Sequence, residues 1–160
     1  MLYKTNNLND IKAFDTKSSE LAIVERKAPS EARLFFEKLM IKPFRFIGKI
    51  RKESALIDLK TILISENSPE IHNKSFYQYW LYDMAKICEI FCEMQNSNAI
   101  GFCLTTKRGC SRYHVDNVSQ RLLVTYAGKG TEWLSEDCAD RHAYLSGSPN
   151  EEIIKKNVKH

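Results

Sequence analysis

The sequence has no long hydrophobic run and no recognisable export signal. Among its 160 residues, no apolar stretch approaches the roughly 18 residues that a membrane-spanning helix needs. The start of the chain, MLYKTNNLNDIK, carries charge but has neither an apolar core nor a small-residue cleavage site. We therefore expect a cytoplasmic protein that does not enter a membrane.

Cysteine is too sparse for a disulfide-stabilised scaffold, and its number is odd. The five residues are Cys88, Cys92, Cys103, Cys110 and Cys138. Together with the missing signal, they indicate a reducing compartment in which they remain thiols or bind metal. Cys88 and Cys92 lie one helical turn apart and could chelate a metal. Because a free cysteine behaves as a small core hydrophobe, we interpret that pair as packing.

Charge of either sign is not concentrated. The formal net charge is +4, and Lys and Arg are scattered rather than gathered in a basic stripe interleaved with aromatic residues. Nucleic acid is therefore not an expected partner. The apolar fraction of 43% excludes a disordered chain, and 160 residues can bury the core of one domain.

The chain shows no internal repeat and no low-complexity segment, so we expect a single domain over residues 1–160. Composition distinguishes four stretches within it. They are a polar, loosely held start (1–18), a mainly helical half (19–95), a β half that carries the candidate site (96–134) and a polar tail (135–160). Helices come first and strands second, an order that is typical of an α+β domain.

The clearest single element spans residues 75–95. Apolar side chains recur there every three or four positions, which predicts a long amphipathic helix: Phe76, Trp80, Met84, Ile87, Phe91 and Met94. Before it, the pattern indicates a strand at 21–24, a helix from Ser30 to Pro43, a weakly favoured helix at 55–64 and a loop at 65–74.

The period changes after Asn96. Three short runs rich in β-branched and aromatic residues follow, at Ala99–Thr106, Ser111–Asp116 and Arg121–Tyr126. Such runs are typical of strands, and the residues between them are turn formers. The sequence therefore predicts a β half made of at least these three strands.

The second of these runs contains a His-x-Asp motif, His114 and Asp116. On a strand, residues two apart point to the same face, so an imidazole and a carboxylate would be presented to one cation. These are two members of the two-His, one-carboxylate triad that binds non-haem Fe(II). In the simpler interpretation, the two side chains form a hydrogen-bonded pair and bind no metal.

A longer run of residues surrounds this pair. From Cys110 to Leu134 the chain resembles the bacterial domain-of-unknown-function family 1826, characterised by a Cys-x-x-x-His-x-Asp segment, then Arg-Leu-Leu, Thr-Tyr and Gly-x-Gly-Thr-Glu-Trp-Leu. The residues that match are Cys110, His114, Asp116, Arg121, Leu122, Leu123, Thr125, Tyr126, Gly128, Gly130, Thr131, Glu132, Trp133 and Leu134. The same run also looks like the first half of a 2-oxoglutarate-dependent oxygenase.

The oxygenase resemblance implies that His114 and Asp116 bind Fe(II), and that Arg121 and Tyr126 line a pocket for a cofactor such as 2-oxoglutarate. It also implies an α+β fold in which N-terminal helices pack on a partial double-stranded β-helix, a jelly-roll-like sheet. Both families need a second histidine on a later strand, and none that fits follows Trp133. We therefore expect a truncated relative that binds metal and an unknown small molecule or protein, without an assigned catalytic residue. Its open sheet edges would favour an oligomer.

The alternative function class is a non-enzymatic zinc-binding or metal-homeostasis accessory protein, in which Cys110 joins His114 and Asp116. The Cys-x-x-x-His spacing of Cys110 and His114 recurs at Cys138 and His142, and thiolate and imidazole are preferred zinc ligands. On a regular strand, residues four apart are about 13 Å apart, so this site needs a bulge or turn near Cys110.

Overall fold

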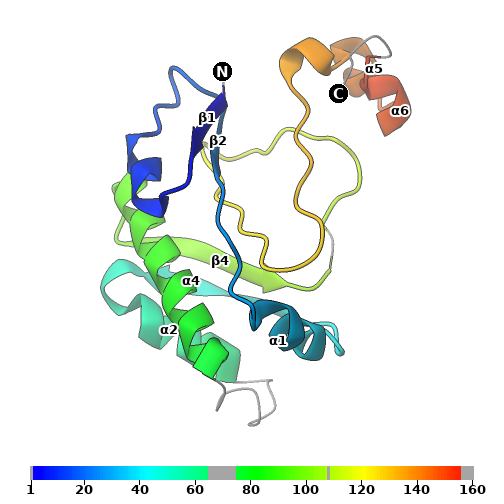
Figure 1. Cartoon of the computed structure of the whole chain (residues 1–160). Coiled ribbons are helices and arrows are strands. Elements are labelled where there is room, and N and C mark those ends of the chain that lie inside the picture. The colour runs from blue at the N-terminus through cyan, green and yellow to red at the C-terminus, as the bar shows by residue number, and fades with distance from the viewer. Residues whose placement is uncertain (1, 65–74, 108, 156–160) are drawn as a thin grey trace. The chain divides into compact units, whose positions relative to one another are not determined.

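The computed structural model describes residues 2–64, 75–107 and 109–155, so the loop expected at 65–74 lies outside the described residues. Contacts divide the chain into two compact units, Met1–Lys107 and Arg108–His160, which we call the N-terminal and C-terminal units (Figure 1). Each unit is described by itself below.

The N-terminal unit begins with a small parallel sheet. Strand β1 (Leu2–Thr5) pairs with β2 (Leu21–Val24), and the 3-10 helix η1 (Leu8–Ala13) connects them. The strand predicted at 21–24 is thus confirmed, although its residues are half-buried rather than buried. Within residues 1–18, expected to be a loosely held start, β1 pairs along its length and Ile11 of η1 is buried.

A second sheet is antiparallel. Strand β3 (Arg45–Arg51) pairs with β4 (Ala99–Thr105) over their whole length. Strand β4 confirms the first strand predicted in the β half, whereas the sequence analysis did not predict β3. Phe46 and Ile50 of β3 are buried on one face, whereas Ile47 and Lys49 between them are exposed.

Helices α2 (Ala55–Ile64) and α4 (Ser75–Met94) pack against this sheet. Helix α1 (Ala32–Leu39) packs against α4, and the 3-10 helix η2 (Lys52–Ser54) contacts α2 and α4. The two strongest helix predictions, α1 and α4, are confirmed, and so is the weaker one at α2. Ser30, however, does not cap α1, because its hydroxyl bonds the Glu31 carboxylate at 3.0 Å.

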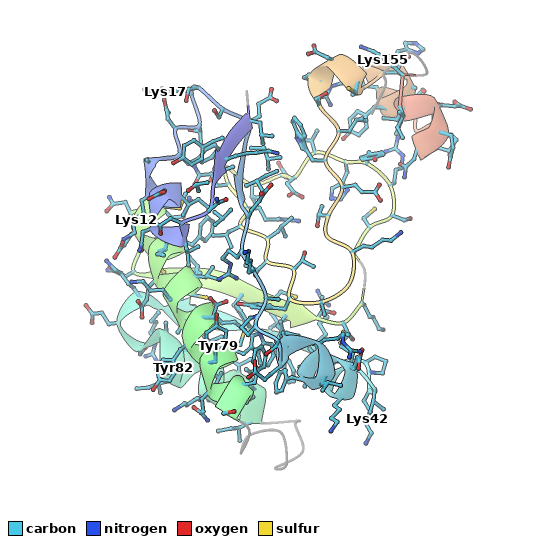
Figure 2. The ribbon with its side chains drawn as sticks, viewed as in Figure 1. Lys12, Lys17, Lys42, Tyr79, Tyr82 and Lys155 are labelled. Atoms are coloured by element: carbon cyan, nitrogen blue, oxygen red, sulfur yellow. The ribbon has the colours of Figure 1, made fainter. Side chains whose placement is uncertain are left out.

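Helix α4 is the central support of the unit. Its Trp80 is 1% exposed and stacks edge-on against Phe35 and Phe36 of α1, with ring centroids 5.6 and 5.5 Å apart. Cys88 and Cys92 of α4 are buried free thiols, as the packing interpretation expected. The opposite face of α4 is open, because Tyr79 and Tyr82 are 52% and 59% exposed (Figure 2).

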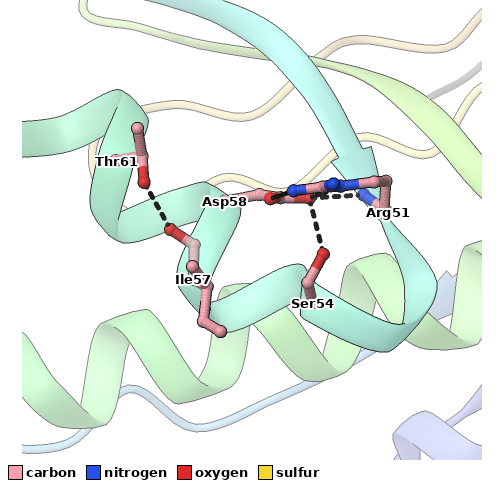
Figure 3. Close-up of polar contacts among 5 residues, drawn as sticks. All are labelled: Arg51, Ser54, Ile57, Asp58 and Thr61. Carbon is pink, nitrogen blue, oxygen red and sulfur yellow. Dashed lines mark hydrogen bonds and ion pairs between the residues drawn. The ribbon is translucent and has the colours of Figure 1, made fainter.

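The junction between β3 and α2 is fixed by one buried carboxylate, that of Asp58 (Figure 3). Oδ2 of Asp58 accepts hydrogen bonds from the backbone N–H of Arg51 at 2.8 Å, from its Nε at 3.1 Å and from the Ser54 hydroxyl at 3.2 Å. Oδ1 accepts a further bond from the Arg51 guanidinium at 2.5 Å. The side-chain hydrogen bonds from Arg51 hold the pKa of Asp58 well below its usual range.

The C-terminal unit contains little regular structure. It has the 3-10 helix η3 (Glu136–Cys138) and two short helices, α5 (Arg141–Leu145) and α6 (Asn150–Ile153). The Asp140 carboxylate caps α5 by accepting from the N–H groups of His142 and Ala143 at 2.9 and 3.0 Å.

Two predicted strands are absent from the described part of this unit. Residues 111–116 and 121–126 are neither strand nor helix, which corrects the prediction of a three-stranded β half. β-branched runs form strands only where a partner strand supplies a ladder, and these runs find none. The α+β class is confirmed, but the sheets of the described residues are two-stranded and form no jelly roll.

No helix in the described ranges has both the length and the hydropathy that a transmembrane segment requires.

Candidate functional site

The segment with the His-x-Asp motif is held in place by contacts with residues 144–150. Arg112 donates from Nε to the carbonyl of Ser148 at 3.1 Å and from its terminal nitrogen to the carbonyl of Tyr144 at 2.8 Å. Its guanidinium also lies over the Tyr144 ring, 5.2 Å from the centroid. These contacts fix the backbone two residues before His114.

Asn150, the first residue of α6, bonds the same segment from both ends of its amide. Its Oδ1 accepts from the N–H of Tyr113 at 2.8 Å, and its Nδ2 donates to the carbonyl of Ser111 at 2.7 Å. The Tyr144 hydroxyl accepts a longer bond from the N–H of Val115 at 3.4 Å. One amide thus satisfies backbone groups that a neighbouring strand would satisfy in a sheet.

We call Tyr144, Ser148 and Asn150 the C-terminal clamp. The clamp was not predicted from the sequence, because its three residues fall in the expected polar tail. No periodic signal marks them, since each bonds a residue 29 to 39 positions away. An asparagine at a helix start is ordinarily read as a local cap, which would not have revealed this long-range contact.

The imidazole of His114 is oriented by the backbone. Its Nδ1 lies 2.9 Å from the carbonyl oxygen of Arg112, and a carbonyl has no proton to give, so Nδ1 carries the hydrogen. In the neutral ring Nε2 is then an acceptor with a free lone pair. That nitrogen faces Oδ1 of Asp116 at 3.4 Å, so two acceptors meet unless a second proton or a cation lies between them.

Asp116 has a second neighbour. The Arg121 guanidinium reaches the same oxygen, Oδ1, at 2.9 Å. About a third of the Asp116 side chain is exposed (32%), as is about half of Arg121 (47%), so solvent reaches the pair. The structure therefore brings Arg121, predicted as a pocket residue for a cofactor, directly to the predicted metal ligand.

The glycine-rich part of the motif also meets this segment. The hydroxyl of Tyr113 donates to the Glu132 carboxylate at 3.2 Å. Glu132 belongs to the Gly-x-Gly-Thr-Glu-Trp portion, so two of the separate pieces of the sequence motif converge in one unit. Trp133 beside it is 48% exposed, and Tyr126, the other predicted pocket residue, is half-buried.

Cys110 is not gathered into the pair. It is exposed, and in the described part of the chain no three His, Cys, Asp or Glu side chains come together closely enough to hold a metal ion. The four residues of the alternative zinc site, Cys110, His114, Cys138 and His142, are all described and are likewise not assembled. Cys138 instead has the Ser135 hydroxyl 2.9 Å from its sulfur.

The chain belongs to the family described as protein of unknown function (DUF1826), whose model matches residues 5–159. The match confirms the resemblance of the Cys110–Leu134 run and extends it through both units. Neither the curated proteins nor the solved structures contain a significant match to the chain.

Proposed function

We propose that this protein binds a divalent metal ion through His114 and Asp116. The observation that carries the proposal is the approach of Nε2 of His114 to Oδ1 of Asp116, 3.4 Å apart. A cation between the two atoms would turn a contact between lone pairs into two coordinate bonds. The hydrogen bond from Nδ1 to the Arg112 carbonyl supports this assignment, because metal-binding histidines ordinarily donate their other N–H in that way.

The ligand types near the pair favour zinc. Imidazole, carboxylate and thiolate are all ligands that zinc takes in proteins, ordinarily four in a tetrahedral arrangement. The oxygenase triad that binds Fe(II) needs a second histidine.

We assign the third protein ligand to Cys110, which would have to move to reach the metal. A thiolate is a preferred zinc ligand. Cys110 is exposed, lies in a stretch without helix or strand, and precedes Ser111, the first residue bonded by the C-terminal clamp. Its movement would therefore break no regular element and none of the clamp bonds. Water would complete the coordination.

The resulting function is that of a zinc-binding protein, with no reaction assigned to the site. Metal content of the purified, untagged protein tests the proposal, together with a competition titration against a chromophoric zinc chelator. We expect about one equivalent of bound zinc, which His114→Ala and Asp116→Ala each abolish or weaken strongly. Cys110→Ser should weaken binding by a smaller amount, because a hydroxyl is a poorer zinc ligand than a thiolate.

The matched control is His142→Ala, which removes an exposed imidazole from the same unit and leaves the His114–Asp116 pair untouched. Zinc binding that is equally weak in His142→Ala and His114→Ala would contradict the proposal. Bound iron in place of zinc, with turnover of 2-oxoglutarate that is lost in His114→Ala, would instead support the oxygenase class.

A further inference from the structure

The oxygen that would face the metal is already in contact with a cation. Oδ1 of Asp116 lies 2.9 Å from the Arg121 guanidinium and 3.4 Å from Nε2 of His114. The same atom therefore takes part in both close contacts, although the carboxylate has a second oxygen available. The residues between Asp116 and Arg121 form no helix or strand, so no regular element imposes this choice.

This arrangement differs from that of an ordinary supporting residue around a metal ligand. A supporting donor stabilises a ligand by holding it in the orientation that the metal needs, and its removal weakens metal binding about 10- to 100-fold. A guanidinium on the coordinating oxygen uses a lone pair of that atom and places a full positive charge next to the metal position. Two cations on one oxygen repel each other, so the Arg121 guanidinium and the metal ion compete for Oδ1 of Asp116.

We propose that Arg121 is a counter-ion for Asp116 in the metal-free protein, and that its guanidinium leaves Oδ1 of Asp116 when the metal binds. This inference rests on the proposed function of the His114–Asp116 pair. In the metal-free protein, Arg121 neutralises the Asp116 carboxylate. When zinc binds, the Arg121 side chain swings into solvent, to which about half of its surface is already exposed.

The consequence is a lower affinity of the site for zinc. Each metal ion must displace an ion pair before it binds, so the site loads less readily than the bare pair of ligands would. Exposed ion pairs are weak, and the effect should amount to about a two- to fivefold reduction in zinc affinity. The ion pair thus sets the zinc concentration at which the site fills.

The decisive variant is Arg121→Gln, measured by the same chelator competition in the full chain. We expect zinc to bind about two- to fivefold more tightly than in the wild type, because the competing cation is gone. Arg121→Lys keeps the charge and should stay close to wild type. The control Lys129→Gln removes an equal charge from another exposed position of the unit and should change the affinity little.

A second readout uses the wild-type protein and does not depend on how the variant folds. Side-chain ¹⁵N spectra of Arg121 report whether its guanidinium is held in an ion pair. Addition of zinc should speed proton exchange at that guanidinium, as it moves from Asp116 into solvent. An unchanged Arg121 signal in the zinc-loaded protein would overturn the inference.

The outcomes separate the two proposals. Zinc binding that needs Asp116 but is weakened or unaffected by Arg121→Gln would overturn the counter-ion role alone. Zinc binding that survives Asp116→Ala, or no zinc binding at all, would overturn the proposed site and the counter-ion role together.

Discussion

Asn150→Ala should loosen the candidate site from a position 36 residues beyond His114 in the sequence. The substitution removes two hydrogen bonds at once, from Tyr113 N–H at 2.8 Å and to the Ser111 carbonyl at 2.7 Å. A net hydrogen bond contributes about 0.5–1.5 kcal/mol, and water can reach this partly exposed amide, so the pair should contribute roughly 1–2 kcal/mol. The segment 111–113 would then open roughly 5- to 30-fold more often.

The assay is hydrogen exchange of the Tyr113 amide, followed by NMR. Its protection should fall by the same factor, and zinc affinity should fall by up to that factor, because binding would have to reorder the segment. Asn150→Asp keeps an acceptor for Tyr113 N–H and loses the donor to Ser111, so an intermediate effect is expected.

Asn117→Ala is the matched control, since Asn117 is exposed in the same unit and lies outside the segment 111–113 that Asn150 bonds. If Tyr113 exchanges at the same rate in Asn150→Ala and in the wild type, the reasoning is refuted. The clamp bonds would then form because the segment 111–113 already lies there, and they would not hold it in place.

Three further predictions concern the N-terminal unit. The pKa of Asp58 is lowered on folding by its hydrogen bonds from Arg51, so its contribution to stability is complete above the unfolded pKa, about 3.9, and is lost as the pH falls below it. Urea unfolding between pH 7 and pH 2 should therefore show a steeper acid loss in the wild type than in Asp58→Asn, and parallel curves would contradict this. Leu59→Ala empties a site that is 0% exposed and should reduce the unfolding free energy by about 2–5 kcal/mol in chemical denaturation. A loss below about 1 kcal/mol would show that the core is not packed around this side chain. Burial raises the pKa of the Cys88 thiol to about 12, so mass spectrometry after alkylation of the native protein at pH 8 should find the exposed Cys103 modified and Cys88 intact.

Helices were predictable here because their signal is local. The apolar positions of α4 repeat every three or four residues, and that period alone defines the face that Trp80 buries. The same holds for α1, whose Phe35 and Phe36 meet α4. Neither assignment needed knowledge of a partner element, because a helix satisfies its own backbone.

Strands were predicted less well because they depend on a partner. Strand β3 was missed because Gly48 interrupts the apolar alternation between Phe46 and Ile50. The structure explains the glycine, since a Cβ at that position would lie 2.4 Å from Cδ1 of Ile62 in α2. The opposite error concerns Arg121–Tyr126, a strand-like run that pairs with no other strand of the described residues.

The sequence by itself determined that His114 and Asp116 form a pair, since a spacing of two residues kept the side chains close even without the predicted strand. Only the tertiary structure decided what surrounds that pair. The C-terminal clamp holds its backbone, Arg121 occupies its carboxylate, and Cys110 stands apart from it. Contacts of this kind join single side chains to distant backbone or charge. They leave no period in the sequence, and only the folded chain brings their members together.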